Sequence, residues 1–244
     1  PRVSEQSVGH LTEVFAKAGE LRRFLGERLQ ELDLYDRRSA HLSNRLYLEV
    51  LRTRMRPFSD GARRFPRMVR DLARSLGKQA RLELLGETTQ VDRDILDRLE
   101  TPLAHLLRNA VDHGCELPAT RLAAGKSEEA VIQLEARHSA GMLMVTITDD
   151  GAGVDTSRLR KVVVDKKLTT AALAERMSET ELLDFLFLPG FTMKDTVTEI
   201  SGRGVGLDVV QNMVKGVRGT IRVMTQAGRG TRFQLQLPLT LSVL

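Results

Sequence analysis

Four polar side chains recur at helical spacing in residues 105–114, which read H-L-L-R-N-A-V-D-H-G. His105 and Asn109 are four residues apart, and Asp112 and His113 follow Asn109 by three and four residues. A helix would therefore place all four on one face, with two imidazoles, an amide oxygen and a carboxylate that can exchange protons or bind a cation. Many polar helix faces are only solvated, but apolar residues flank this one. We expect the helix to present a polar edge beside an apolar surface.

A second segment, D-D-G-A-G, covers residues 149–153 and directly follows an apolar run that alternates as a strand. A carboxylate at the end of a strand can face a pocket, and Gly151 and Gly153 would leave the neighbouring backbone bare to a ligand. Asp and Gly also favour ordinary turns at strand ends, so this segment by itself indicates only a turn.

A third segment, G-R-G-V-G-L-D-V-V, covers residues 202–210, and a fourth, G-T-R-F, opens the last predicted strand at residues 230–233. In the third, Gly202, Gly204 and Gly206 precede a helix whose free N–H groups could face an anion. The spacing is G-x-G-x-G without a strand directly before it, which excludes a dinucleotide-binding fingerprint. No G-K-[ST] follows, which excludes a P-loop.

Together, and in this order, the four segments resemble the N, G1, G2 and G3 boxes of the ATPase fold shared by histidine kinases, gyrase, Hsp90 and MutL. The run F-L-P-G-F-T at residues 187–192 resembles the F box and lies between G1 and G2, as in that family. The pattern H-x-x-x-N-x-x-D-H-G and the L-P-L-T-L ending at residues 237–241 are similar to those of CheA-type chemotaxis kinases. The resemblance covers most of residues 60–240 and implies an ATP-dependent protein-histidine kinase.

The resemblance also implies roles around the adenine ring of ATP. Asp149 would accept a hydrogen bond from the exocyclic amine. Gly151 and Gly153 would let the base approach the backbone, and Thr231 would support the edge of the ring.

Around the phosphates, the resemblance makes Asn109 the side-chain ligand of Mg²⁺, whose other ligands would be phosphates and water. Asp112 joins the ATP-binding set, and His113 would lie near the phosphates. His105 stands where related kinases place a general base or an orienting acceptor for the attacking histidine. The remaining glycines would bracket the triphosphate beneath a lid of roughly residues 165–201; they are Gly202, Gly204 and Gly206.

No histidine in the chain has the context of a phosphoacceptor. Conventional sensor kinases carry H-E-x-x-x-P on their dimerisation helix, whereas His10 is followed by Leu-Thr and His41 by Leu-Ser. The resemblance therefore implies that the substrate histidine belongs to a separate phosphotransfer domain, which would then serve a response regulator.

Residues 1–56 are predicted to be helical. Leu11, Ala18, Leu25 and Leu32 recur at intervals of seven, which forms an apolar seam along one side of a helix. A break is predicted near residues 33–39, followed by a second helix, so that the two form a helical hairpin. The seam either pairs with a second hairpin in a homodimer, which we favour, or packs on the rest of the same chain.

Residues 57–238 mix helices and strands without strict alternation, which favours an α+β fold with helices on one face of a sheet. Helices are predicted at about 63–76, 91–113, 157–164, 178–187 and 206–215, and strands at 80–85, 131–137, 142–148, 219–225 and 231–237. The resemblance implies a GHKL (Bergerat) α/β sandwich here, preceded by the dimerisation domain. Residues 239–244 would begin a truncated CheW-like regulatory domain, through which a CheW-like adaptor and chemoreceptors would act.

The amino-acid composition limits the classes of protein to which this chain can belong. The one cysteine excludes an internal disulfide, and no apolar run approaches the length of a membrane span. Both features suit a cytoplasmic protein. The resemblance to CheA implies a location at membrane-associated receptor arrays. The net charge is +5, and the densest basic region consists of arginines between residues 52 and 74. Aromatic residues are not interleaved there in the manner of a single-strand binder, which favours a solvated helix face over a nucleic-acid site. Two alternatives stay open: a DNA-acting ATPase of the same fold, which would bind DNA in a salt-dependent way, and a non-catalytic scaffold.

Overall fold

The computed structural model describes residues 5–193 and 206–240, and it divides the chain after Arg54 into an N-terminal and a C-terminal unit. The N-terminal unit holds one helix, α1 (Glu5–Arg54), of 50 residues. The predicted break near residues 33–39 is therefore wrong, and the helical hairpin is not formed. Those residues contain no glycine or proline to end a helix, and Arg37 pairs with Asp33 one turn away at 2.8 Å.

The apolar stripe of α1 faces solvent. Leu25 and Leu32 expose 52% and 64% of their surface, and the stripe continues beyond residue 39 with Leu42 and Leu46 at 66% and 65%. The spacing of three and four residues thus runs on through the segment where a break was predicted. One long helix presents a longer seam than either arm of the predicted hairpin would have offered.

A five-stranded sheet forms the centre of the C-terminal unit, with the strand order β2-β4-β5-β7-β6. The strands β2 and β4 are parallel, and the other neighbours are antiparallel. A separate two-stranded sheet pairs β1 (Met55–Pro57) with β3 (Gln90–Asp92). The strands of the main sheet are β2 (Ala80–Leu85), β4 (Ala130–Ser139), β5 (Met142–Asp149), β6 (Thr220–Gln226) and β7 (Gly230–Pro238).

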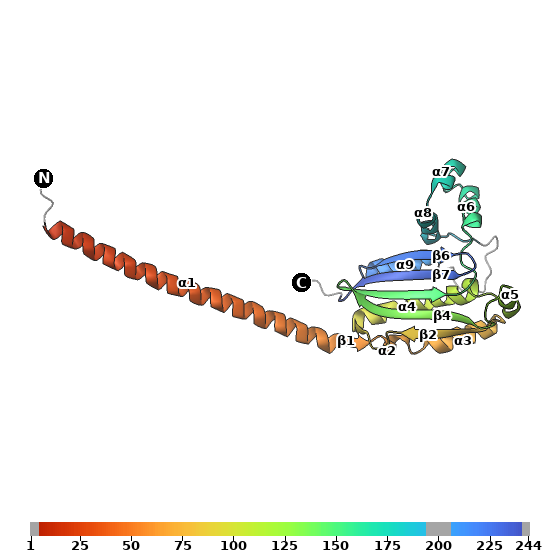
Figure 1. Ribbon diagram of the computed structural model, residues 1–244, viewed down its shortest axis with the longest axis horizontal. Helices are drawn as coiled ribbons and strands as arrows, with labels where there is room; N and C mark the ends of the chain where they lie inside the picture. The colour runs from red at the N-terminus through yellow and green to blue at the C-terminus, as the bar shows by residue number, and fades with distance from the viewer. Residues whose placement is uncertain (1–4, 194–205, 241–244) are drawn as a thin grey trace. The chain divides into compact units, whose positions relative to one another are not determined.

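The helices α4 and α9 lie on one face of this sheet (Figure 1). Along β4, Ile132 and Leu134 on this face are buried while Gln133 and Arg137 on the other face are exposed, so the sheet buries one side against helices. The described helices of this unit are α2 (Ser59–Ala62), α3 (Phe65–Ser75), α4 (Arg93–Asn109), η1 (Ala110–Gly114), α5 (Pro118–Ala123), α6 (Thr156–Asp165), α7 (Ala171–Arg176), α8 (Glu179–Asp184), η2 (Phe185–Phe187) and α9 (Leu207–Gly216). The predicted α+β layering is confirmed, although the short helices α2, α5 and α7 were not predicted.

Within the described ranges, no helix is both long and apolar enough to cross a membrane.

Continuity of α1 can be tested with spin labels at Glu20→Cys and Glu49→Cys, because the only native cysteine, Cys115, is buried. A single helix separates these backbone positions by about 44 Å, at a rise of about 1.5 Å per residue. A hairpin turning near residue 36 would bring them to about 10–20 Å. Dipolar electron resonance, on labelled chains diluted with unlabelled chains, should report the long distance; a dominant short distance would restore the hairpin.

Candidate functional site

The helix α4 ends at Asn109, which the sequence places at the edge of the core. Its N-terminus is fixed by Asp92, whose carboxylate accepts a hydrogen bond from the Asp94 amide at 2.9 Å. One side of the helix is buried, including Leu103 and Leu106. Asn109 is half-buried, and its carboxamide has no hydrogen-bond partner within the described ranges. That amide is therefore available to a ligand.

The chain continues from α4 into η1, a wider π-helical turn closed by a bond of 2.8 Å from the Cys115 amide to the Ala110 carbonyl. Such turns recur at functional sites because they displace side chains from the regular helical positions. Lys78 stabilises this turn from outside: its ammonium donates to the carbonyls of Val111 at 2.9 Å and Asp112 at 2.7 Å. Sequence analysis did not assign Lys78 any role.

Two predicted site residues, Asp112 and His113, lie on this turn. Asp112 is half-buried and His113 is exposed. The His113 Nε2 atom is 3.3 Å from the Asp112 Oδ2 atom. His105 is half-buried one helical turn before Asn109, on the same face of α4. Of the four polar residues of the segment, His105 and Asn109 thus lie on α4, whereas Asp112 and His113 lie on the π-helical turn that follows it.

Asp149 ends β5 with only 3% of its surface exposed. Its Oδ1 atom accepts two backbone hydrogen bonds, from Gly151 at 3.0 Å and from Thr231 at 3.3 Å. No donor from the described residues reaches Oδ2. Burial raises the pKa of the Asp149 carboxyl to about 6, although the two amides oppose the rise. The result is a buried carboxylate with one oxygen held and one left for an incoming donor.

Glycines let three backbone segments close around Asp149. A Cβ at Gly151 would collide with the Gly114 carbonyl at the end of η1, and one at Gly230 would collide with the Asp149 carbonyl. Gly230 also has a φ of +109°, which L side chains rarely adopt. At Gly114, a Cβ would stand 2.9 Å from the Asp149 Oδ1 atom. Close packing of the protein on itself therefore requires glycine at these positions.

Gly153 has a φ of +73°, and a Cβ there would crowd the Gln226 carbonyl at the end of β6. Two backbone bonds hold the loop between these positions: Ala152 donates to Gly114 at 2.9 Å, and Gly228 donates to Ala152 at 2.8 Å. The loop after Asp149 is thus fastened both to η1 and to the turn between β6 and β7.

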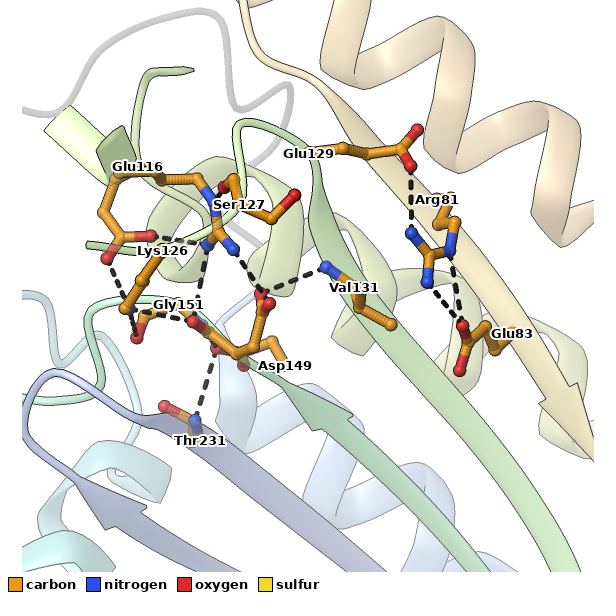
Figure 2. A network of polar contacts seen from close by, with 12 residues as sticks. Arg81, Glu83, Glu116, Lys126, Ser127, Glu129, Val131, Asp149, Gly151 and Thr231 are labelled. Atoms are coloured by element: carbon orange, nitrogen blue, oxygen red, sulfur yellow. Dashed lines mark hydrogen bonds and ion pairs between the residues drawn. The ribbon is translucent and has the colours of Figure 1, made fainter. Parts of the chain in front are cut away.

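Asp150, the second aspartate of the D-D-G-A-G segment, points away from this cradle into an ion cluster that sequence analysis missed. Its carboxylate accepts from Arg121 at 2.8 Å and from the Val131 amide at 3.0 Å. Glu116 and Lys126 complete the cluster, which Figure 2 shows beside Asp149. Nothing in the local sequence distinguishes these charges from solvated ones, because their partners are distant along the chain.

The segment that resembles an F box is folded as a tight turn beside the core. Phe187 is buried at the end of η2, and Phe191 donates its amide to the Leu188 carbonyl at 3.0 Å. Lys166 lies over the ring of Phe191, with its ammonium 5.4 Å from the ring centroid. Gly190 has a φ of +70° in this turn.

The glycine-rich segment is only partly described. Gly206 caps the N-terminus of α9, whereas Gly202 and Gly204 lie outside the described residues. The described part of the predicted lid contains α7 and α8. The described residues include no group of three or more His, Cys, Asp or Glu side chains that could hold a metal ion.

The buried charge of Asp149 should lower the stability of the ligand-free protein. Its pKa is about 6 in the folded state, against an ordinary value of 3.8. Between these values the folded state holds a proton that the unfolded state has lost, so rising pH destabilises the fold until about pH 6. Asp149→Asn should therefore raise the free energy of unfolding by roughly 1–3 kcal/mol at pH 7.5 and by almost nothing near pH 4.

The measurement is denaturant unfolding of both proteins at a series of pH values. Asp150→Asn is the matched control, because it removes a neighbouring carboxylate that is paired with Arg121 and should destabilise the protein at pH 7.5. An Asp149→Asn protein that is less stable than the parent at pH 7.5 would contradict this account of the site.

Comparison with known proteins places this site in a family. A family model described as histidine kinase-, DNA gyrase B-, and HSP90-like ATPase matches residues 95–241. The chain is 39% identical over 207 residues to the chemotaxis protein CheA of Bacillus subtilis, covering 85% of this chain and 31% of that protein. Over 203 residues it is 39% identical to CheA of Rhizobium meliloti, covering 83% of this chain and 26% of that protein.

The sensor histidine kinase CheAY of Helicobacter pylori is 37% identical over 223 residues, covering 91% of this chain and 28% of that protein. This chain thus spans between about a quarter and a third of the length of these relatives. The family match extends over more than half of the chain and includes most of α4, the carboxylate of Asp149 and the strand that begins at Gly230. On that match, the chain belongs to the histidine kinase-, DNA gyrase B- and HSP90-like ATPases.

Proposed function

We propose that this chain is the catalytic core of a CheA-type histidine kinase. It binds Mg-ATP and transfers the γ-phosphate to a histidine on a separate phosphotransfer domain, which then serves a response regulator. The main support for the proposal is the environment of Asp149. Its carboxylate is buried, two backbone amides donate hydrogen bonds to Oδ1, and Oδ2 is open to a donor.

An adenine exocyclic amine is the donor that fits this oxygen. Guanine carries a carbonyl at the equivalent ring position, and a carbonyl facing a buried carboxylate leaves both groups unpaired. Thr231 supports the edge of the base, since its amide already positions Asp149 from β7. Gly151 and Gly153, whose lack of side chains the fold itself requires, also leave the backbone bare beside the base. The site should therefore prefer ATP to GTP.

The phosphates and the metal belong at the C-terminal end of α4. Asn109 offers a half-buried amide oxygen without a partner in the described ranges, which suits one ligand position of Mg²⁺; phosphates and water fill the others. The ion, when bound, neutralises charge on the transferring phosphoryl group. Asp112 and His113 follow on η1, and the exposed His113 would lie near the phosphates. Gly206, at the N-terminus of α9, continues the phosphate site together with Gly202 and Gly204.

His105 is proposed to act on the incoming histidine. It lies one turn before Asn109 on the same face of α4, so an imidazole that reaches the γ-phosphate there can donate a hydrogen bond to His105. Phosphoryl transfer depends mainly on positioning and charge neutralisation, which this arrangement supplies.

The proposed partners follow from the resemblance to CheA: a CheW-like adaptor and chemoreceptors in cytoplasmic arrays.

A DNA-acting ATPase is disfavoured by the basic region, where several arginines are paired with acidic side chains. Arg63 contacts Asp60 at 2.7 Å, Arg67 contacts Asp71 at 3.4 Å, and Arg64 pairs with Glu100. Paired, exposed charges form a solvated surface, and we expect no nucleic-acid binding.

Transfer is tested with radiolabelled ATP, the chain alone, and the chain with a phosphotransfer domain from the same organism. We expect no acid-labile label on the chain alone and label on the added domain. Asn109→Ala should abolish Mg²⁺-dependent transfer, and Asp149→Asn should weaken ATP binding sharply because an amide NH₂ replaces the acceptor. His105→Ala should slow transfer about 10²-fold or more while largely sparing ATP binding.

Three outcomes would count against the proposal. Acid-labile label on the chain itself would overturn transfer to a separate domain. Tight ATP binding without label on the added domain would favour a scaffold. Salt-dependent binding of DNA would favour the gyrase-like class.

The homodimer is proposed to form through α1, whose apolar seam is exposed in a single chain. Leu25→Glu places a charge in this seam and should convert the dimer to a monomer in light scattering. Gln30→Glu is the matched control, because residue 30 lies off the seam and is already exposed. A parent protein that is monomeric at high concentration, or a Leu25→Glu protein that stays dimeric, would contradict pairing through α1.

A further inference from the structure

An ion cluster connects the segment after η1 with the loop after Asp149. We call it the Arg121 cluster; it consists of Glu116, Arg121, Lys126 and Asp150. Figure 2 shows Glu116 and Lys126 beside Gly151 and Asp149. The cluster holds two positive and two negative charges, so it is neutral as a unit.

Arg121 is the centre of the cluster and has only 1% of its surface exposed. Its Nε atom donates to the Ser127 carbonyl at 2.7 Å, one terminal nitrogen donates to Glu116 at 3.0 Å, and the other donates to Asp150 at 2.8 Å. A buried guanidinium is tolerated only with such pairing, because an unpaired charge in the interior is costly. Arg121 thus binds Asp150 in a fixed geometry.

Lys126 directs two ammonium hydrogen bonds to the loop after Asp149 and a third to Glu116. It contacts Glu116 at 2.7 Å, the Asp150 carbonyl at 2.8 Å and the Gly151 carbonyl at 2.7 Å. Two successive carbonyls therefore point to one cation. Because the Gly151 amide bonds the Asp149 Oδ1 atom, the orientation of these peptide units sets the direction of the Asp149 carboxylate.

The cluster also controls the charge around Asp149. Glu116 and Asp150 are the carboxylates that raise the pKa of Asp149, after the larger effect of its burial. Burial is the largest single influence on the pKa of Glu116 and raises it, but the contacts with Lys126 and Arg121, together with a backbone hydrogen bond, lower the pKa by more in sum. Both carboxylates contact these cations: Glu116 pairs with Arg121 and Lys126, and Asp150 pairs with Arg121. Loss of either cation would expose Asp149 to an unbalanced negative charge.

We propose that Arg121 and Lys126 are positioning residues of the nucleotide site, which hold the loop of residues 149–152 so that the open oxygen of Asp149 faces the adenine amine before ATP arrives. The inference rests on the proposed ATP-binding function and adds two residues that do not touch the nucleotide. It accounts for a nearly fully buried arginine in the segment after η1.

The groups that face Asp149 come from each element around it. The amides of Gly151 and Thr231 favour its ionised form, and burial together with the two carboxylates of the Arg121 cluster favours the neutral form. The nearby thiol of Cys115 has its own pKa raised to about 12 by burial and by Asp149, so it stays uncharged near neutral pH. A change at Lys126 therefore acts on Asp149 without a competing titration from the thiol.

The test uses Lys126→Met, which keeps the length of the side chain but removes its charge and donors. Lys126 is less deeply buried than Arg121, so this variant is the more robust one to fold. Calorimetry should show ATP binding weakened about tenfold or more at pH 7.5. In the ligand-free protein, ¹³C NMR of the aspartate carboxyls should show the Asp149 midpoint moved upward. Lys126→Arg should keep part of the ATP affinity and should shift the Asp149 midpoint less, because it keeps the positive charge.

Arg81→Met is the matched control. Arg81 holds a comparable ion cluster, with Glu83 at 2.8 Å and Glu129 at 3.0 Å, which Figure 2 shows apart from Asp149. It is exposed and touches no part of the loop of residues 149–152. Losing two ion pairs there should leave both ATP affinity and the Asp149 midpoint at the parent values.

The outcomes are distinguishable. A folded Lys126→Met protein with the ATP affinity and the Asp149 titration midpoint of the parent would overturn the inference. A lower melting temperature of this variant, with both of those quantities unchanged, would overturn it as well. A parent protein that fails to bind ATP would contradict the proposed function. In that case the NMR midpoint of Lys126→Met still decides whether Lys126 controls Asp149.

Discussion

A carboxylate removed from water is the constraint around which the rest of the C-terminal unit is arranged. Burying the charge of Asp149 is unfavourable unless donors replace the lost water. The Gly151 and Thr231 amides provide two of these donors, and they come from positions 2 and 82 residues away in the chain. The ends of β5, β7 and η1 must therefore meet at one point, and glycines at 114, 151 and 230 remove the side chains that would keep them apart.

The polar edge of α4 depends on the same convergence. The apolar side of α4 packs into the core, which fixes the rotation of the helix and leaves His105 and Asn109 at the rim. The helix then widens into η1, whose carbonyls are bound by Lys78 and by the Ala152 amide. This turn is held from two sides, so the amide of Asn109 and the carboxylate of Asp149 belong to one rigid frame. A site of this kind is prepared by the fold before any ligand binds.

The two units of the chain rely on different sources of stability. The C-terminal unit buries an aliphatic core between helices and sheet, whereas α1 exposes its leucines and has local ion pairs, such as Lys17 with Glu13 at 2.7 Å. Exposed pairs of this type contribute little. Most of the stability of a long helix comes from packing of its apolar face, which points to association as the source of stability for α1. The proposed dimerisation and the proposed nucleotide binding thus reside in separate parts of the sequence.

Local patterns in the sequence determined much of this protein. The strand at 80–85 was predicted with the bounds that β2 has, and the prediction for β5 differs by one residue, because alternation of apolar and polar side chains is a local property. The order of the four segments that resemble the N, G1, G2 and G3 boxes, which include Asn109 and Asp149, could also be recognised in the sequence. The predicted break in α1 was wrong, because a run of charges without glycine or proline does not end a helix. Only the tertiary structure decided the roles of Lys78, Arg121 and Lys126. Their partners lie between 5 and 34 residues away. The sequence shows the residue type of each charge but not whether that charge is buried and paired or solvated.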